Sequence, residues 1–118
     1  MISLNPVYYD LLSLNSVLNT DNMSVLGLTL DYGPFGFLDR YDPDHICNGS
    51  DNSGRYSFRS QPSICQWNCS KLAEAIKDYL PASRAKQALL KFEEIFNEHY
   101  LNKMRKKLGL FLTLESDT

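Results

Sequence analysis

The spacing of apolar residues predicts an amphipathic helix that ends before Pro81. Its apolar face repeats at i, i+4, i+7 and i+8, which is one side of an α-helix, and consists of Leu72, Ile76, Tyr79 and Leu80. Asn68 or Ser70 is placed to cap the start, because short polar side chains accept hydrogen bonds from the first free N–H groups. Pro81 ends the helix because it has no backbone N–H. We expect this face to lie in the core.

A second helix is predicted after Pro81. Ser83 is a candidate N-cap, and Gly109 is a candidate C-terminal residue because glycine ends many helices. The predicted core face is continuous between them and consists of Ala85, Leu89, Phe92, Phe96, Tyr100 and Met104. The basic run at residues 103–107 suits the end of a helix, where cations interact favourably with the helix dipole.

The first half of the chain shows no helical pattern. Residues 23–30 are mostly apolar, and we expect a strand over about 24–30 followed by a turn. Residues 39–66 are rich in turn-forming residues and predict an ordered but irregular segment. Four acidic residues in it fit no EF-hand loop. Capping of local turns through their carboxylates is the preferred interpretation over calcium binding for Asp39, Asp42, Asp44 and Asp51.

Composition indicates one modest globular domain. The chain has 118 residues, is 43% hydrophobic and 12% aromatic, and carries a formal net charge of −2, which argues against a disordered tail. Residues 1–70 carry seven acidic residues and three arginines, whereas residues 71–118 carry nine basic and seven acidic residues. No basic surface interleaved with stacking aromatics is visible, so no nucleic-acid partner is predicted. No apolar run approaches membrane-spanning length, so no membrane association is predicted.

The three cysteines do not form a metal-binding or disulfide pattern. Cys65 and Cys69 are separated by three residues instead of the two typical of zinc knuckles, and Cys47 stands alone. We interpret all three as reduced, partly buried thiols. Asn22, Asn48 and Asn68 begin glycosylation sequons by pattern only.

The candidate chemistry lies in an Asp-Asn pair and an Asp-Tyr-Gly turn. Asp21-Asn22 is followed nine residues later by Asp31, and the residues between them are mostly apolar. In kinase-class phosphoryl-transfer sites, two Mg²⁺ ions are held by a catalytic-loop Asn and by an Asp on a glycine turn. Mg²⁺ prefers oxygen ligands, which Asn22 and Asp31 can supply. A surface turn is the alternative interpretation of residues 31–34, because Asp and Gly before Pro are ordinary turn residues.

A longer pattern resembles the selenoprotein O family. The resemblance covers roughly residues 17–110 and is specific. Its main strings are Asn19-Thr20-Asp21-Asn22-Met23-Ser24, Leu26 through Asp39, and Tyr41-Asp42-Pro43-Asp44-His45. It continues through Gly54-Arg55-Tyr56, Gln61-Pro62, Trp67-Asn68, Lys71 through Ala75 and Tyr100 through Leu110.

The resemblance implies a kinase-like enzyme that moves AMP from ATP onto Ser, Thr or Tyr hydroxyls of proteins. It implies that Asp21 accepts the hydroxyl proton, and that Asn22 and Asp31 hold Mg²⁺, with Mn²⁺ as an alternative metal. Asp31 would also reach the ATP phosphates through the metal. The implied fold class is α+β: part of a protein-kinase-like C-lobe in which the catalytic loop and metal-binding strand-turn precede an irregular segment and two helices. Family members in eukaryotes are mitochondrial; otherwise a cytoplasmic location is expected.

The resemblance stops at both ends of the chain. Family members have His-Gly where this chain has Asn15 and Ser16, and residues 1–16 show no match. Residues 111–118 form a tail with no diagnostic pattern. The chain contains no glycine-rich phosphate loop and no strand lysine of the kinase type. We expect a fragment of the parent enzyme that lacks activity by itself; the alternative is a non-catalytic nucleotide- or metal-binding or inactive product.

Overall fold

The computed structural model describes residues 13–15, 17–26 and 35–110. Two short antiparallel strands pair in the register Leu14↔Gly36. Three α-helices and two 3₁₀ turns make up the rest of the secondary structure in these described ranges. In chain order the elements are β1 (Ser13–Asn15), η2 (Thr20–Asn22), β2 (Phe35–Phe37), η3 (Phe58–Ser60), α1 (Gln61–Ala75), α2 (Ala82–Leu90) and α3 (Phe92–Lys107).

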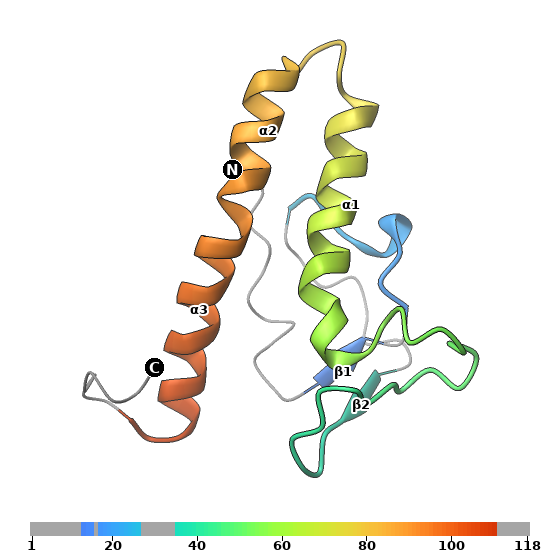
Figure 1. Ribbon diagram of the computed structural model, residues 1–118, viewed down its shortest axis with the longest axis vertical. Coiled ribbons are helices and arrows are strands. Elements are labelled where there is room, and N and C mark those ends of the chain that lie inside the picture. Colours follow the sequence, from blue (N-terminus) through green and yellow to red (C-terminus); the bar gives the residue numbers. More distant parts are fainter. Residues whose placement is uncertain (1–12, 16, 27–34, 111–118) are drawn as a thin grey trace.

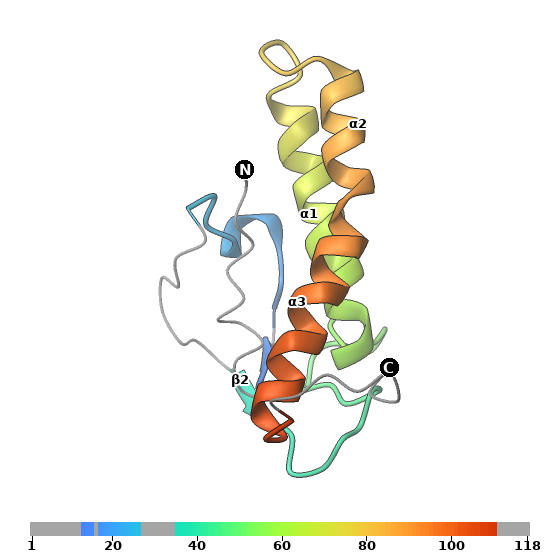
Figure 2. The same ribbon diagram turned by 90° about the vertical axis from the view of Figure 1, so that its left-hand side faces the viewer.

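The helices form the long part of the molecule. Helix α1 lies beside α2, and α3 continues from α2 back past α1 toward the β1–β2 pair (Figure 1). Turn η2 lies on another side of α1, as the view in Figure 2 confirms. The side-chain amide of Gln66 in α1 donates a 3.1 Å hydrogen bond to the carbonyl of Leu89 in α2. Helix α1 is therefore the element that α2, η3 and the η2 turn all contact.

The first predicted helix exists, but its predicted boundaries are wrong, and of its predicted core face only Leu72 and Leu80 are partly buried. Helix α1 begins at Gln61, inside the segment expected to be irregular, and ends at Ala75. Pro62 lies in the first turn, where backbone N–H groups have no intrahelical acceptor. Its lack of an N–H therefore costs no hydrogen bond, and proline is favourable at this start of the helix. Ile76 and Tyr79 lie in the turn that follows, and Tyr79 is 92% exposed.

The second predicted helix is divided into two. Its predicted face is confirmed: all six residues are partly buried, whereas most of their neighbours are exposed. Phe92 stacks on Phe96 with ring centroids 6.2 Å apart, and Phe96 stacks on Tyr100 at 5.8 Å. The helix breaks at Lys91, which ends α2 and precedes α3. The N-cap is Pro81 and not Ser83.

The end of α3 has the geometry that the sequence predicts. Gly109 has φ +74°, a left-handed conformation that glycine adopts without a Cβ penalty. Its N–H donates to the carbonyl of Lys106 at 3.2 Å, and the N–H of Leu110 donates to Arg105 at 2.8 Å. This pair of bonds is a Schellman motif, which satisfies two of the last helical carbonyls. Arg105 and Lys106 lie in the last turn, where cations are favourable.

Residues 24–26, the described part of the segment predicted as a strand over about 24–30, do not form a strand. Val25 and Leu26 lie in a turn, and residues 27–30 are outside the described ranges. The N–H of Leu26 donates to Ser24 Oγ at 3.2 Å, a local bond that favours turning over extension.

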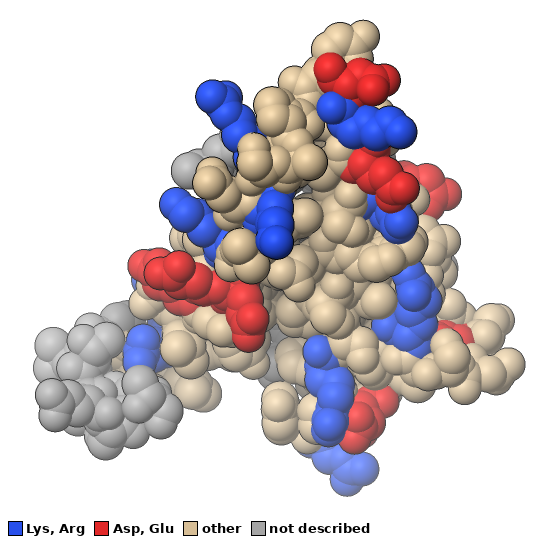
Figure 3. Space-filling view, turned by 45° about the horizontal axis from the view of Figure 1, so that its top comes forward, with Lys and Arg blue, Asp and Glu red and all other residues tan. Residues whose placement is uncertain are grey.

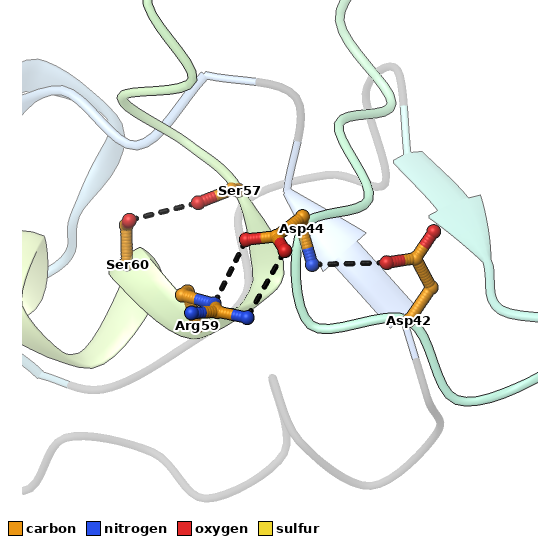
Figure 4. Close-up of polar contacts among 5 residues, drawn as sticks. All are labelled: Asp42, Asp44, Ser57, Arg59 and Ser60. Atoms are coloured by element: carbon orange, nitrogen blue, oxygen red, sulfur yellow. Dashed lines mark hydrogen bonds and ion pairs between the residues drawn. The ribbon is translucent and has the colours of Figure 1, made fainter.

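The segment before η3 is irregular as predicted, and two of its carboxylates cap local turns. Asp42 accepts from the N–H of Asp44 at 3.0 Å. Asp51 accepts from the N–H groups of Arg55 at 3.0 Å and of Tyr56 at 2.8 Å. Asp44 is instead paired with Arg59 in η3, with Nε 2.9 Å from Oδ1 and Nη2 3.0 Å from Oδ2 (Figure 4).

The buried core is small and lies where these loops meet the start of α1. Leu38 and Phe58 form its centre, with Cys47 packed against them, and Tyr41 meets Phe58 edge-on at 6.1 Å. A Cβ on Gly36 would lie 2.9 Å from Cys47 Cβ, so only glycine fits at this approach. The core therefore fixes β2 and the irregular segment against η3.

The outer surface of the helices carries both signs of charge. On the face shown in Figure 3, Lys and Arg side chains are interspersed with Asp and Glu side chains. None of the helices in the described ranges is both long and apolar enough to cross a bilayer.

Candidate active-site turn

The candidate site is the turn that carries Asp21 and Asn22. It begins after Asn19, whose backbone is extended, and continues as the single 3₁₀ turn η2. The N–H of Asn22 donates to the carbonyl of Asn19 at 3.1 Å and closes the turn. A three-residue turn of this kind gives weak support, because short 3₁₀ segments have poorer hydrogen-bond geometry than α-helices. The position of the turn must therefore depend on contacts from outside it.

The side chain of Asn22 is bound inside the loop through its amide nitrogen. Its Nδ2 donates to the carbonyl of Val17 at 3.1 Å. Because the nitrogen is used inside the loop, the amide oxygen is the atom left to accept an external partner. Asn22 is exposed, and a neutral amide oxygen is an ordinary ligand for Mg²⁺. The donor set at this residue therefore fits the predicted metal.

Asp21 is also exposed, and within the described ranges its carboxylate has no hydrogen bond or ion pair. The structure therefore leaves it available to an incoming group. Asp31, the other predicted metal ligand, lies outside the described residues, so its distance from Asn22 is not defined. Among described residues, no three His, Cys, Asp or Glu side chains gather into a metal-binding group.

Tyr56 anchors the start of the turn. Its hydroxyl donates a short hydrogen bond to Asn19 Oδ1 across 37 positions of the chain. Tyr56 is itself held on two sides: its N–H by Asp51 and its carbonyl by Gln61 Nε2 at 3.1 Å. Gln61 is only 1% exposed. Backbone hydrogen bonds, chiefly that from Tyr56, lower the pKa of Asp51, so the carboxylate stays ionised and keeps these bonds.

Asn68 contacts both sides of the turn from α1. Its Nδ2 lies 3.0 Å from the carbonyl oxygen of Leu18 and 2.8 Å from Met23 Sδ. Both Asn68 and Leu18 are buried. The sequence predicted Asn68 as a helix cap or a sequon and as part of the family resemblance, but not as an anchor of the turn. It lies in the middle of α1, and a glycan on a buried amide that donates to the backbone is incompatible with this fold.

A groove separates the turn from the next part of α1. It has a volume of about 310 Å³ and is lined on the turn side by Thr20, Met23, Ser24 and Val25, and on the helix side by Asn68, Cys69, Lys71, Leu72 and Ala75. Lys71 and Arg55 both lie over the ring of Trp67, at 5.5 Å and 4.8 Å. Of these two cations, Lys71 also lines the groove, and its Nζ is paired with Glu74 Oε2 at 2.8 Å.

The cysteines are free thiols, as predicted. Burial is the main cause that raises the pKa of Cys65 to about 12, with a smaller effect from Cys69. Burial also raises the pKa of Cys47 and of Cys69. None of them has the lowered pKa that marks a reactive nucleophile.

Comparison with known proteins identifies the class. Residues 13–118 match the family described as "Protein adenylyltransferase SelO". The chain is 65% identical over 96 residues to Protein adenylyltransferase SelO-1, mitochondrial, of Danio rerio, an alignment that covers 81% of this chain and 14% of that protein. It is 60% identical over 105 residues to the protein of Homo sapiens named Protein adenylyltransferase SelO, mitochondrial (87% and 16%). It is 50% identical over 103 residues to Protein nucleotidyltransferase YdiU of Myxococcus xanthus (87% and 21%).

The chain belongs to the SelO family of protein adenylyltransferases, which confirms the resemblance seen in the sequence. It spans between 14% and 21% of the length of these relatives. Sequence reasoning found the Asp21-Asn22 turn but missed the roles of Tyr56 and Asn68. Neither residue lies near the turn in the chain, so no local spacing could have revealed the contacts.

Proposed function

We propose that this chain supplies the metal-binding and proton-accepting turn of an ATP-dependent protein adenylyltransferase. The observation that carries the proposal is the exposed Asp21-Asn22 turn, in which Asn22 Nδ2 donates to the Val17 carbonyl and the amide oxygen is the atom left to accept a partner. Family membership supports the reaction class. The fold in which the turn would work is a kinase-like C-lobe of the α+β class.

Each residue has a distinct proposed role. Asn22 and Asp31 hold Mg²⁺, or Mn²⁺ in its place. That ion would neutralise charge on the ATP phosphates as the reaction proceeds. Asp21 takes the proton from a Ser, Thr or Tyr hydroxyl of the acceptor protein. The hydroxyl oxygen then bonds to the α-phosphorus, the bond from that phosphorus to the bridging oxygen breaks, and pyrophosphate leaves.

The proposed partners are ATP and proteins with accessible hydroxyl side chains. The proposed compartment is the mitochondrion, on the basis of the names of the vertebrate relatives. The 118-residue chain alone is proposed to lack transfer activity, because its sequence has no glycine-rich loop or strand lysine to orient a triphosphate.

The test uses a full-length family protein that carries residues 17–110 of this chain, called the parent enzyme below. It is incubated with labelled ATP, Mg²⁺ and a generic protein acceptor. We expect AMP on the acceptor, a loss of about 10²–10³-fold or more on Asp31→Ala, since a preorganised electrostatic group is removed, and a milder loss on Asn22→Ala. Asp39→Ala is the matched control, because Asp39 is an exposed loop carboxylate. Near-normal transfer by Asp31→Ala would refute the metal assignment.

A further inference from the structure

Asn68 connects the candidate turn to helix α1. Its Nδ2 donates to Leu18, which precedes the turn, and contacts Met23, which follows it. Leu18 and Met23 are the residues that flank the segment carrying Asp21 and Asn22. One buried amide therefore holds the two ends of that segment against α1.

The side-chain oxygen of Asn68 indicates that this residue does more than stabilise the fold. Asn68 Oδ1 is buried and has no hydrogen-bond partner in the described part of the chain. A buried acceptor without a partner has lost its hydration with no replacement, which offsets much of what the donor bonds contribute. An apolar side chain would avoid that cost, but it could not bind the Leu18 carbonyl. The benefit of asparagine here is thus the position of the loop.

Tyr56, in the irregular segment before η3, restrains the same loop through a second contact. Its hydroxyl binds the side chain of Asn19, directly before the turn. Tyr56 is buried, and it is fixed by Asp51 and Gln61. The turn therefore has anchors in two separate segments, the irregular loop and α1, in addition to its own short 3₁₀ backbone bonding.

On the basis of the proposed function, we propose that Asn68 is a positioning residue for adenylyl transfer, with Tyr56 as its partner. The two residues touch neither ATP nor acceptor in this proposal. They hold Asp21 where it can accept the proton of the acceptor hydroxyl, and Asn22 where it can bind the metal ion. A displacement of about 1 Å at such a site can cost about 10²-fold in rate.

The closing experiment compares two variants of the parent enzyme that each lose one amide-to-backbone bond from α1. Asn68→Ala releases the turn, whereas Gln66→Ala removes the equivalent bond to Leu89 in α2 and is the matched control. We expect kcat to fall about 10- to 100-fold in Asn68→Ala, with the KM for the acceptor protein unchanged. We expect kcat to stay within about twofold in Gln66→Ala, since α2 does not carry the turn.

Hydrogen exchange provides a readout that does not depend on catalysis. Asn68→Ala should raise amide exchange in residues 17–26 and leave residues 82–90 unchanged, and Gln66→Ala should do the reverse. If Asn68→Ala does not fold, Tyr56→Phe decides: it removes one hydroxyl, and it should raise exchange at residues 17–26 and lower kcat by about 3- to 10-fold.

Unchanged exchange in residues 17–26 overturns the proposal, as does a loss of kcat that is equal in Asn68→Ala and Gln66→Ala. Failure of the unmodified parent enzyme to transfer AMP refutes the proposed function instead. In that case the exchange comparison still decides whether Asn68 positions the turn.

Discussion

The side-chain amide of Asn68 donates a 3.0 Å hydrogen bond to the backbone carbonyl of Leu18, which lies 50 positions earlier in the chain. This bond joins the middle of α1 to the loop that carries the candidate catalytic residues. Because backbone carbonyls are obligatory acceptors, the buried carbonyl of Leu18 needs such a partner. The candidate site therefore depends on a helix that contributes none of its proposed catalytic groups.

The first prediction separates the proton acceptor from the metal ligand in the parent enzyme. Asp21→Asn keeps the size of the side chain but cannot accept the proton, so transfer should fall by about 10²–10⁴-fold while nucleotide binding persists. Asp31→Asn should also weaken Mg²⁺-dependent ATP binding, because a negative charge facing the metal is lost. Calorimetric titration of ATP with Mg²⁺ distinguishes the two. Loss of binding in Asp21→Asn as complete as in Asp31→Asn would make Asp21 a ligand.

The second prediction concerns the acid dependence of stability through Asp51. Its pKa is lowered in the folded state, so its contribution to stability is present above its unfolded pKa of about 3.9 and is lost as pH falls through the folded value. Asp51→Asn should therefore be less stable than the wild type at pH 7, and the difference should shrink at a pH of about 2. Urea unfolding at both pH values measures it, with the exposed Asp39→Asn as control. An equal difference at both values would contradict the assignment.

The third prediction concerns thiol reactivity. Since the pKa of Cys65 is raised to about 12 by burial, the reactive thiolate is scarce at pH 8. Cys65 should be alkylated by iodoacetamide more slowly than Cys47 in the folded protein, and all three cysteines should react alike in urea. Mass spectrometry of the labelled peptides gives the rates. Fast labelling of Cys65 before unfolding would show that its surroundings in α1 are open.

The fourth prediction concerns the end of α3. Gly109→Ala should destabilise the protein by about 1 kcal/mol, because alanine is strained at positive φ. No atom of the described residues lies within 4 Å of the added Cβ, so the expected effect is backbone strain. Gly49→Ala is the matched control, with equally open surroundings and no left-handed φ. An equal loss of unfolding free energy in the two variants, measured by urea unfolding, would exclude backbone strain at position 109.

Local chemistry alone determined several parts of this protein. The apolar repeat from Ala85 to Met104 correctly predicted the face that packs, and Gly109 correctly marked the end of α3. The Asx turns at Asp42 and Asp51 were also predicted. These features depend on hydrogen bonds and periodicity within a few residues, so a single sequence contains the information.

Only the tertiary structure decided the rest. Helix α1 starts at Gln61, whose buried side chain donates to the carbonyl of Tyr56, a contact that turn propensity at Pro62 does not reveal. The anchors of the candidate turn come from Tyr56 and Asn68, which are 37 and 50 positions away from their partners. Such contacts depend on which surfaces meet after folding, and residue type and spacing do not determine that. The sequence thus identified the reacting groups, whereas packing against α1 determined how they are held.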